Sequence, residues 1–300
     1  MSDETSKGVV GFIGIGTMGR EMAINLANAG HRVKAYDVRR EAVDALAPFG
    51  IDAAASIADA STAADAVVTM LPDTPDVEAV VRGDGGLLAH PPAGRLVIDM
   101  STIAPGAVRR MSADLARIGV AFLDAPVSGG PIGARNAALS IMAGGDAAAF
   151  EKARRFFSAM GTTITHVGES GSGQTVKLCN QLICGINLQA ICEALALGRA
   201  AGVDLPRLRE VLMGGSAASW MLDKLGPQMI EGDASAGFRI DLMLKDLRLV
   251  AQQAAETNVP LPATSLVTTQ YLDARAHGEG SNGNQALFRV YDRMSGQAPA

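Results

Sequence analysis

Three glycines near the start of the chain have the spacing of a dinucleotide-binding turn. They are Gly14, Gly16 and Gly19, and they lie between the apolar run Val9–Ile13 and a helical pattern that ends at Gly30. The first glycine permits a tight turn, the second lets the backbone approach a pyrophosphate, and the third lets the helix pack on the strand. The helix N-terminus adds free N–H groups. We therefore expect a dinucleotide to contact Gly14, Gly16, Thr17, Met18 and Gly19.

An acidic residue at the end of the next predicted strand bears on the choice between NAD and NADP. Asp37 follows the run Arg32–Tyr36 and lies 18 residues after Gly19, near the distance expected for a carboxylate that binds the ribose 2′-hydroxyl. Such a carboxylate favours NAD because it repels a 2′-phosphate. Arg39 and Arg40 favour NADP, since arginine binds that phosphate. We predict NAD and keep NADP as the alternative.

Two lysines are candidates for the proton transfer that accompanies hydride transfer to or from a nicotinamide. Lys177 follows the glycine-rich stretch Gly171–Gly173 at the start of a long apolar pattern. Lys245 lies among apolar neighbours in the stretch Phe238–Leu247. For either residue, a solvated lysine on a helix surface is an equally good interpretation, because lysine is usually exposed.

A proline- and glycine-rich stretch, Asp124–Ala134, follows another predicted strand. Its composition predicts a turn in which Ser128, Gly129 and Gly130 present a hydroxyl and backbone N–H groups. Successive N–H groups bind a carboxylate or a phosphate well. The alternative is an ordinary tight loop.

The predicted secondary structure indicates how these candidate residues are positioned, and it differs between the two halves of the chain. Apolar strands alternate with helices up to residue 167, which predicts an α/β, doubly wound, mostly parallel sheet of the Rossmann type, covered on both faces. Ligands bind such sheets beyond the carboxyl ends of the strands, where the polar residues cluster. We expect strands at 9–13, 32–37, 66–70, 95–100, 120–124, 139–143 and 163–166, and helices that include 105–118 and 146–159.

Beyond residue 167 the patterns are helical. We expect a dinucleotide-binding domain at 1–168 and an all-helical domain for substrate binding and oligomerisation at 169–300. The apolar run from Gly171 to Gly202 predicts a long central helix buried on several sides. Its apolar character favours a homodimer or homotetramer. Further helices are expected at 205–214, 217–224, 240–257, 261–277 and 284–294.

Composition excludes several classes of protein. The 300 residues are 48% hydrophobic, enough for two domains with cores, and the net charge of −5 comes from interspersed acids and bases, which argues against nucleic-acid binding. No uninterrupted apolar run is expected to span a bilayer, and the polar segment Met1–Thr5 is unlike a signal peptide, so we expect a cytoplasmic protein. Disulfides, a metal site and a Ser/His hydrolase are not expected, because the three cysteines fall in one predicted helix and the four histidines are scattered.

Six stretches together match the pattern of a known family. They are GFIGIGTMG (11–19), LP (71–72), DMSTIAP (99–105), DAPVSGGPIGA (124–134), GSGQTVKLCNQ (171–181) and FRIDLMLKDL (238–247). In this order they resemble the β-hydroxyacid dehydrogenase family, which includes 3-hydroxyisobutyrate dehydrogenase and tartronate semialdehyde reductase. The resemblance implies an NAD(P)-dependent oxidoreductase that acts on a CH–OH group and interconverts a short β-hydroxy acid and its semialdehyde. It also implies a Rossmann-type domain joined to an all-α domain by a long helix.

The resemblance also implies roles for individual residues. Lys177 would be the catalytic acid/base, residues 128–130 would bind the substrate carboxylate, and Asn180 and Gln181 would contact substrate oxygens. Many members have a second Asn where this chain has Gln181. The residues expected to serve the cofactor beyond the glycine turn are Leu71, Pro72 and Thr102, which would line the nicotinamide side, and Lys245.

Other functions stay open at this point. One is an NADPH-dependent reductase of glyoxylate or succinic semialdehyde, which would differ in its substrate pocket. Another is a non-catalytic cofactor-binding module, although relatives of that kind lack the lysine that is present here as Lys177. The helical half is too short for 6-phosphogluconate dehydrogenase, a cousin with a similar first domain.

Overall fold

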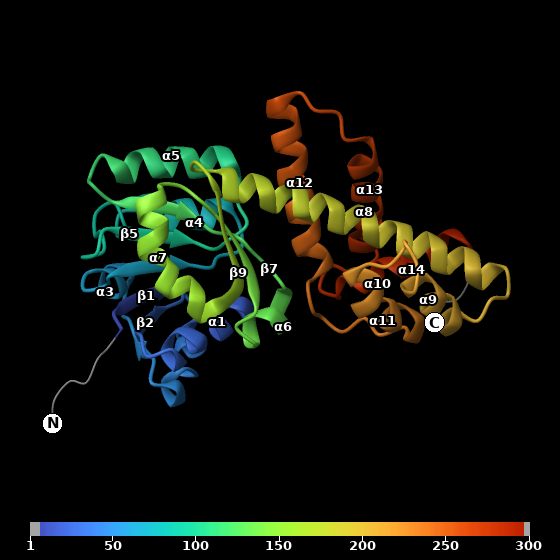
Figure 1. The fold of residues 1–300 in the computed structure, drawn as a ribbon, viewed down its shortest axis with the longest axis horizontal. Helices are drawn as coiled ribbons and strands as arrows, with labels where there is room; N and C mark the ends of the chain where they lie inside the picture. Colours follow the sequence, from blue (N-terminus) through green and yellow to red (C-terminus); the bar gives the residue numbers. More distant parts are fainter. Residues whose placement is uncertain (1–6, 297–300) are drawn as a thin grey trace. The chain divides into compact units, whose positions relative to one another are not determined.

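The computed structural model describes residues 7–296, so the predicted absence of a signal peptide at Met1–Thr5 lies outside the described residues. The chain divides into two compact units, Met1–Lys177 and Leu178–Ala300 (Figure 1). The division falls inside helix α8 (Ser172–Ala200), whereas the sequence places it before this helix, at 168/169. The physical reason is that the start of α8 bonds to the first unit, where Asp124 accepts hydrogen bonds from the N–H groups of Gly171 and Gln174.

Within the described residues, the first unit is built on a nine-stranded sheet in the order β3-β2-β1-β4-β5-β6-β8-β7, with β9 paired to β8. Strands β1 to β6 pair in parallel, β8 runs antiparallel to β6 and β7, and β9 runs parallel to β8. The first six strands have the doubly wound order, which confirms the predicted Rossmann-type sheet. The strands are β1 (Val9–Ile13), β2 (Arg32–Tyr36), β3 (Asp52–Ala53), β4 (Ala66–Thr69), β5 (Leu96–Asp99), β6 (Ala121–Asp124), β7 (Val127–Ser128), β8 (Leu139–Gly144) and β9 (Gly161–Gly168).

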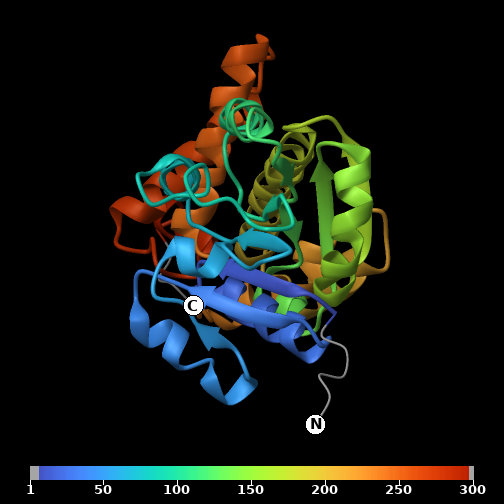
Figure 2. The same ribbon diagram turned by 90° about the vertical axis from the view of Figure 1, so that its left-hand side faces the viewer.

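Helices cover both faces of this sheet (Figure 2). Every residue of β4 and β5 is buried, and successive residues of a strand point to opposite faces, so neither face is open to solvent there. Helices α1 (Thr17–Asn28) and α7 (Ala147–Met160) pack against each other, as do α4 (Thr74–Arg82) and α5 (Pro105–Ala116). Shorter elements are α2 (Arg40–Asp44), η1 (Ala47–Phe49), α3 (Ile57–Ser61) and α6 (Gly130–Arg135).

The described part of the second unit is helical, as the sequence predicts, and contains no named strand. Its core joins Leu188, Cys192 and Leu195 of α8 to Leu247 and Tyr271. Helices α12 (Ile240–Thr257) and α13 (Pro262–Ala276) lie side by side in this unit (Figure 1). The other helices are α9 (Leu205–Met213), α10 (Trp220–Lys224), α11 (Gly226–Glu231), η2 (Asn284–Leu287) and α14 (Phe288–Met294).

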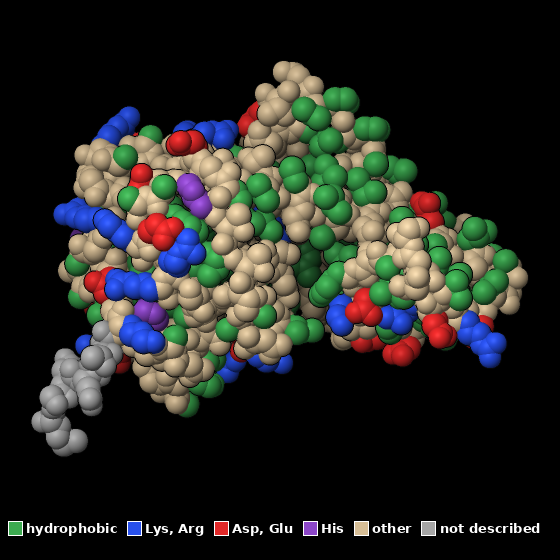
Figure 3. Space-filling view, viewed as in Figure 1, with side chains coloured by type: hydrophobic (Ala, Val, Ile, Leu, Met, Phe, Trp, Pro, Cys, Tyr) green, Lys and Arg blue, Asp and Glu red, His purple; other side chains and the backbone are tan. Residues whose placement is uncertain are grey.

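Helix α8 is less enclosed than the sequence predicts. Ile183 is 64% exposed and Leu197 is 73% exposed, so an apolar stripe of this helix faces outward. Figure 3 shows hydrophobic side chains over much of the face of the second unit that is in view. By length and composition alone α8 could also cross a membrane, which corrects the expectation that no such segment exists. The core helix of a soluble protein passes the same test, and Leu188 and Leu195 are fully buried.

Candidate active site

The glycine turn between β1 and α1 has the conformation that a pyrophosphate site needs. Gly14 has a φ of +99°, and a Cβ there would lie 2.3 Å from the carbonyl oxygen of Met70. A Cβ on Gly19 would lie 2.0 Å from the carbonyl oxygen of Gly14. Side chains are therefore excluded at both positions, because the turn, the strand end and the helix are in direct backbone contact.

The start of α1 is open. Gly16 precedes the helix, and in the described part of the chain no side chain caps its first N–H groups. A Cβ built on Gly16 meets no atom within 4 Å. Thr17, the first helical residue, is exposed, and Met18 is half-buried. Open backbone at the positive end of a helix dipole fits the pyrophosphate of a dinucleotide.

Asp37 lies directly after β2 and is tied to this turn. Its Oδ2 accepts a hydrogen bond from the N–H of Ile15 at 2.7 Å, and its Oδ1 accepts one from the N–H of Arg39 at 2.8 Å. The Arg39 guanidinium is 3.4 Å from the same carboxylate, while Arg40 pairs with Asp44 at 2.8 Å. The carboxylate of Asp37 and the guanidinium of Arg39 are therefore adjacent, beside the position expected for the ribose.

The loops after β4 and β5 are joined by a partly buried polar contact that sequence reasoning missed. The Ser101 hydroxyl accepts a hydrogen bond from the N–H of Leu71 at 2.9 Å and donates to Oδ1 of Asp99 at 2.6 Å. This contact fixes Leu71 and Pro72 on one strand end and Thr102 on the next. The available signal was the group of polar residues Asp99, Ser101 and Thr102 at the end of a buried strand.

The stretch predicted to bind a carboxylate is more ordered than a plain loop. Ser128 ends β7, which pairs antiparallel with β8, and its partner residue is Ser140. Gly129 directly precedes α6, which begins at Gly130 and which the sequence pattern did not predict. Ser128 is half-buried and Gly129 is exposed. The hydroxyl and the backbone of this turn are thus held by a strand on one side and a helix on the other.

The first turn of α8 is held by the end of β6. The Asp124 carboxylate accepts hydrogen bonds from the N–H groups of Gly171 and Gln174, each at 2.8 Å. Burial raises the pKa of the Asp124 carboxyl to about 6, against the opposing effect of these two hydrogen bonds. Lys177 follows Gln174 within the same helix and is 6% exposed. It is therefore not the solvated surface lysine that the sequence left open.

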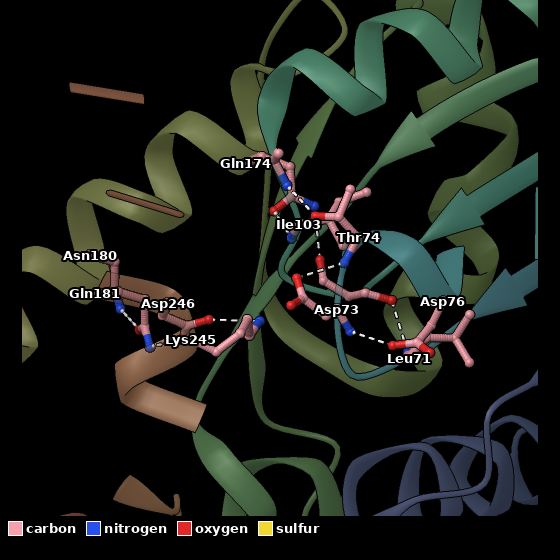
Figure 4. A network of polar contacts seen from close by, with 12 residues as sticks. Leu71, Asp73, Thr74, Asp76, Ile103, Gln174, Asn180, Gln181, Lys245 and Asp246 are labelled. Atoms are coloured by element: carbon pink, nitrogen blue, oxygen red, sulfur yellow. Dashed lines mark hydrogen bonds and ion pairs between the residues drawn. The ribbon is translucent and has the colours of Figure 1, made fainter. Parts of the chain in front are cut away.

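In the second unit, three of the predicted residues are brought together by one that was not predicted. Asn180 Nδ2 donates to Gln181 Oε1 at 2.8 Å, and Gln181 Nε2 donates to Oδ2 of Asp246 at 2.5 Å. Lys245 pairs with Oδ1 of Asp246 at 2.8 Å (Figure 4). Asp246 is buried, and it links the start of α8 in this unit to α12. The sequence feature that could have identified Asp246 is its position beside Lys245 in the stretch 238–247.

Family models match both halves of the chain. Residues 9–168 match the family model described as the NAD binding domain of 6-phosphogluconate dehydrogenase. Residues 171–291 match the one described as NAD-binding of NADP-dependent 3-hydroxyisobutyrate dehydrogenase. Together with the site above, these matches define a nicotinamide-dependent oxidoreductase.

Similarity to individual proteins gives the family. The chain is 40% identical over 286 residues to 2-hydroxy-3-oxopropionate reductase of Escherichia coli (strain K12), covering 95% of this chain and 98% of that protein. It is 39% identical over 295 residues to NAD-dependent L-serine dehydrogenase of Pseudomonas aeruginosa, covering 96% and 99%. The solved structure of Mycobacterium tuberculosis 3-hydroxyisobutyrate dehydrogenase with L-serine superposes with a TM-score of 0.86 at 33% identity, covering 94% and 98%.

The chain belongs to the β-hydroxyacid dehydrogenase family. It has the NAD(P)-dependent dehydrogenase activity of that family, which acts on the CH–OH group of β-hydroxy acids, as the sequence predicts.

Proposed function

We propose that this enzyme interconverts a short β-hydroxy acid and its semialdehyde, with Lys177 as the acid/base. The favoured pairs are D-glycerate with 2-hydroxy-3-oxopropionate (tartronate semialdehyde) and 3-hydroxyisobutyrate with its semialdehyde. The observation that carries the role of Lys177 is its burial on the helical turn after the Asp124 anchor. Burial is unusual for a lysine, because transfer of an ammonium group from water is costly, and lysines that act as general bases are typically buried.

The proposed chemistry divides between cofactor and protein. A bound nicotinamide supplies or accepts the hydride. Lys177 donates a proton to the carbonyl oxygen during reduction and accepts one from the hydroxyl group during oxidation. An ordinary lysine has a pKa near 10.4, so oxidation is expected to speed up as the pH rises. Residues 128–130 hold the substrate carboxylate, and Asn180 and Gln181 hold its other oxygens.

We propose NAD as the preferred cofactor. Asp37 is the supporting residue, because its carboxylate lies beside the glycine turn and repels a 2′-phosphate. NADPH-dependent reduction of glyoxylate or succinic semialdehyde is the second candidate. It is favoured by Arg39, whose side chain is 59% exposed beside Asp37 and is therefore available to a phosphate. Leu71, Pro72 and Thr102 are proposed to line the nicotinamide side of the cofactor, and Lys245 is proposed to contribute a charge to it.

We also propose a cytoplasmic homodimer or homotetramer. The exposed Ile183 and Leu197 on α8 support an assembly, because burying them against a second copy removes apolar surface from water. Light scattering coupled to gel filtration tests this, with Ile183→Lys as the variant. A wild-type protein that elutes as a monomer contradicts the assembly.

The catalytic role is tested with Lys177→Ala. The control is Lys152→Ala, which changes an exposed lysine on α7. Both variants are assayed with tartronate semialdehyde, 3-hydroxyisobutyrate, L-serine, glyoxylate and succinic semialdehyde, with each cofactor. Loss of an acid/base should lower kcat by about 10²–10⁴-fold while NADH binding is retained. Turnover within a factor of two of wild type in Lys177→Ala would exclude the role.

A further inference from the structure

A buried glutamine bridges the first turn of α8 and the loop after β5. Gln174 is fully buried. Its Oε1 accepts a hydrogen bond from the N–H of Ile103 at 3.0 Å, and its Nε2 donates to the carbonyl of Ser101 at 2.8 Å (Figure 4). Its backbone N–H donates to Asp124 at the end of β6. One residue therefore connects the helix to two neighbouring strand ends.

The carboxamide of Gln174 complements the hydrogen-bonding groups of the loop after β5. One side of the site presents a donor and the other an acceptor, and an amide is the uncharged side chain that offers both an acceptor oxygen and donor hydrogens in a plane. An apolar side chain of the same length would leave a buried N–H and a buried C=O without partners. Gln174 thus satisfies both backbone groups of a loop that has no regular secondary structure.

The backbone of α8 sits directly on the strand ends at this point. A Cβ on Gly173 would lie 2.4 Å from the carbonyl oxygens of both Asp124 and Met142. No side chain separates the helix from the sheet there. The carboxamide of Gln174 therefore sets the distance between α8 and the loop after β5. The carboxylate of Asp124 sets the distance between α8 and the end of β6.

The two segments that Gln174 joins carry residues of the proposed active site. Thr102 lies between its two bonded residues, Ser101 and Ile103. Lys177 lies three residues further along α8, about one helical turn away. Gln174 is fully buried, and both polar atoms of its amide bond to this loop rather than to a substrate.

We propose that Gln174 is a positioning residue, whose carboxamide sets the distance between Lys177 and the loop that carries Thr102. This inference rests on the proposed role of Lys177. A displacement of about 1 Å between reacting groups can cost about 100-fold in rate. Loss of the bridge should therefore lower kcat more than cofactor binding, which depends on the glycine turn.

The first test is Gln174→Met, which keeps the length of the side chain and removes both hydrogen bonds. The control is Gln189→Met, a buried glutamine further along α8 whose amide donates to Glu193 of the same helix. We expect kcat for semialdehyde reduction to fall about 30–100-fold in Gln174→Met, with the Kd for NADH changed less than about threefold. Gln189→Met should stay within about a factor of two of wild type.

The second test is Gln174→Glu, which supplies a rescue. A protonated glutamic acid donates to Ser101 and accepts from Ile103, whereas the ionised form cannot donate. Asp99 on β5 and Asp124 on β6 disfavour the ionised form, and Lys177 on α8 favours it. We expect the ratio of variant to wild-type kcat to be near one at about pH 5 and to approach that of Gln174→Met above about pH 7. The same ratio for Gln174→Met, which adds no titrating group, shows how much of the profile comes from Asp124 alone.

The outcomes separate the two proposals. Wild-type kcat in Gln174→Met, an equal loss in Gln189→Met, or a pH-independent loss in Gln174→Glu overturns the positioning role. If Gln174→Met does not fold, the pH profile of Gln174→Glu decides alone. Lys177→Ala is measured alongside, because activity in that variant overturns the proposed function itself. An inactive Lys177→Ala beside a fully active Gln174→Met overturns the positioning role alone.

Discussion

The carboxylate of Asp124, at the end of β6, accepts a hydrogen bond from the backbone N–H of Gln174 at 2.8 Å. Its other oxygen accepts one from Gly171 at the same distance. The first N–H groups of a helix have no partner within the helix, and its dipole favours a negative charge there. Asp124 therefore satisfies two buried donors, while its own burial makes the charge costly.

Replacement of Asp124 by alanine should destabilise the protein more than loss of an ordinary helix cap. Two buried N–H groups lose their acceptor, so we expect the free energy of unfolding to fall by about 2–4 kcal/mol. Asp146 caps α7 by accepting from Ala149 at 2.8 Å at an exposed position, so Asp146→Ala should cost about 1 kcal/mol. Urea denaturation of both variants measures the difference. Equal losses would show that burial adds nothing at Asp124.

The titration of Asp124 should contribute to the pH dependence of the free energy of unfolding. Its folded pKa of about 6 lies above the ordinary 3.8, so between these values the folded protein binds more protons than the unfolded chain. The contribution of Asp124 to stability therefore increases as the pH falls from about 6 to about 4. Relative to Asp124→Asn, which does not titrate, wild type should gain about 1–3 kcal/mol between pH 7 and pH 4.5. Urea denaturation at the two pH values checks the sign, and a constant difference contradicts the assignment.

Cofactor preference should depend on Arg39 rather than Arg40. Arg39 pairs with Asp37 and also bonds to the carbonyl of Ile15 in the glycine turn, whereas Arg40 pairs with Asp44 on α2. Arg39→Ala should lower kcat/KM for NADPH about tenfold and change kcat/KM for NADH less than about twofold, since a hydrogen bond to a charged group contributes about 1.5–3 kcal/mol. Arg40→Ala is the matched control. A larger loss with NADPH in the control runs against this prediction, and a wild-type preference for NADPH contradicts the proposed preference for NAD.

Two glycines of the turn should separate stability from binding. A methyl group on Gly19 collides with the carbonyl of Gly14, so Gly19→Ala should lower the free energy of unfolding by about 1–3 kcal/mol. A methyl group on Gly16 meets no protein atom within 4 Å, so Gly16→Ala should fold normally and bind NADH at least about tenfold more weakly. Thermal unfolding and NADH fluorescence titration give the two readouts. Normal NADH affinity in Gly16→Ala argues against a pyrophosphate at this position.

Hydrophobic patterns in the sequence predict the helices and strands that are determined by their own residues rather than by tertiary contacts. Strand β5 reads as an apolar run that ends in polar residues, and the long apolar pattern identifies α8. The two-residue strand β7 and the helix α6 were not predicted. β7 depends on pairing with β8, and the glycine and proline content of Gly130–Arg135 resembles that of a loop. Such short elements are stabilised by tertiary contacts, which a local pattern does not contain.

The same limit applies to the site. Gly14 and Asp37 belong to one strand–helix–strand unit, so their spacing predicts their neighbourhood. The partners of Gln174 lie 71 and 73 residues away in sequence, and Gln181 bonds to Asp246 across 65 residues. A glutamine in a helical pattern gives no sign of which strand end its amide will reach. Its importance becomes visible when the fold places that strand end beside it.

The division of the chain inside α8 has a consequence for exchanging halves between relatives. A junction at Glu169, ahead of the helix, would separate Asp124 from the amides of Gly171 and Gln174 that come with the other parent. A junction after Lys177 keeps that bonding intact and passes on the proposed acid/base with the dinucleotide-binding half. Asn180 and Gln181 would then arrive with the new helical half. Chimeras joined there should inherit cofactor preference from one parent and substrate range from the other.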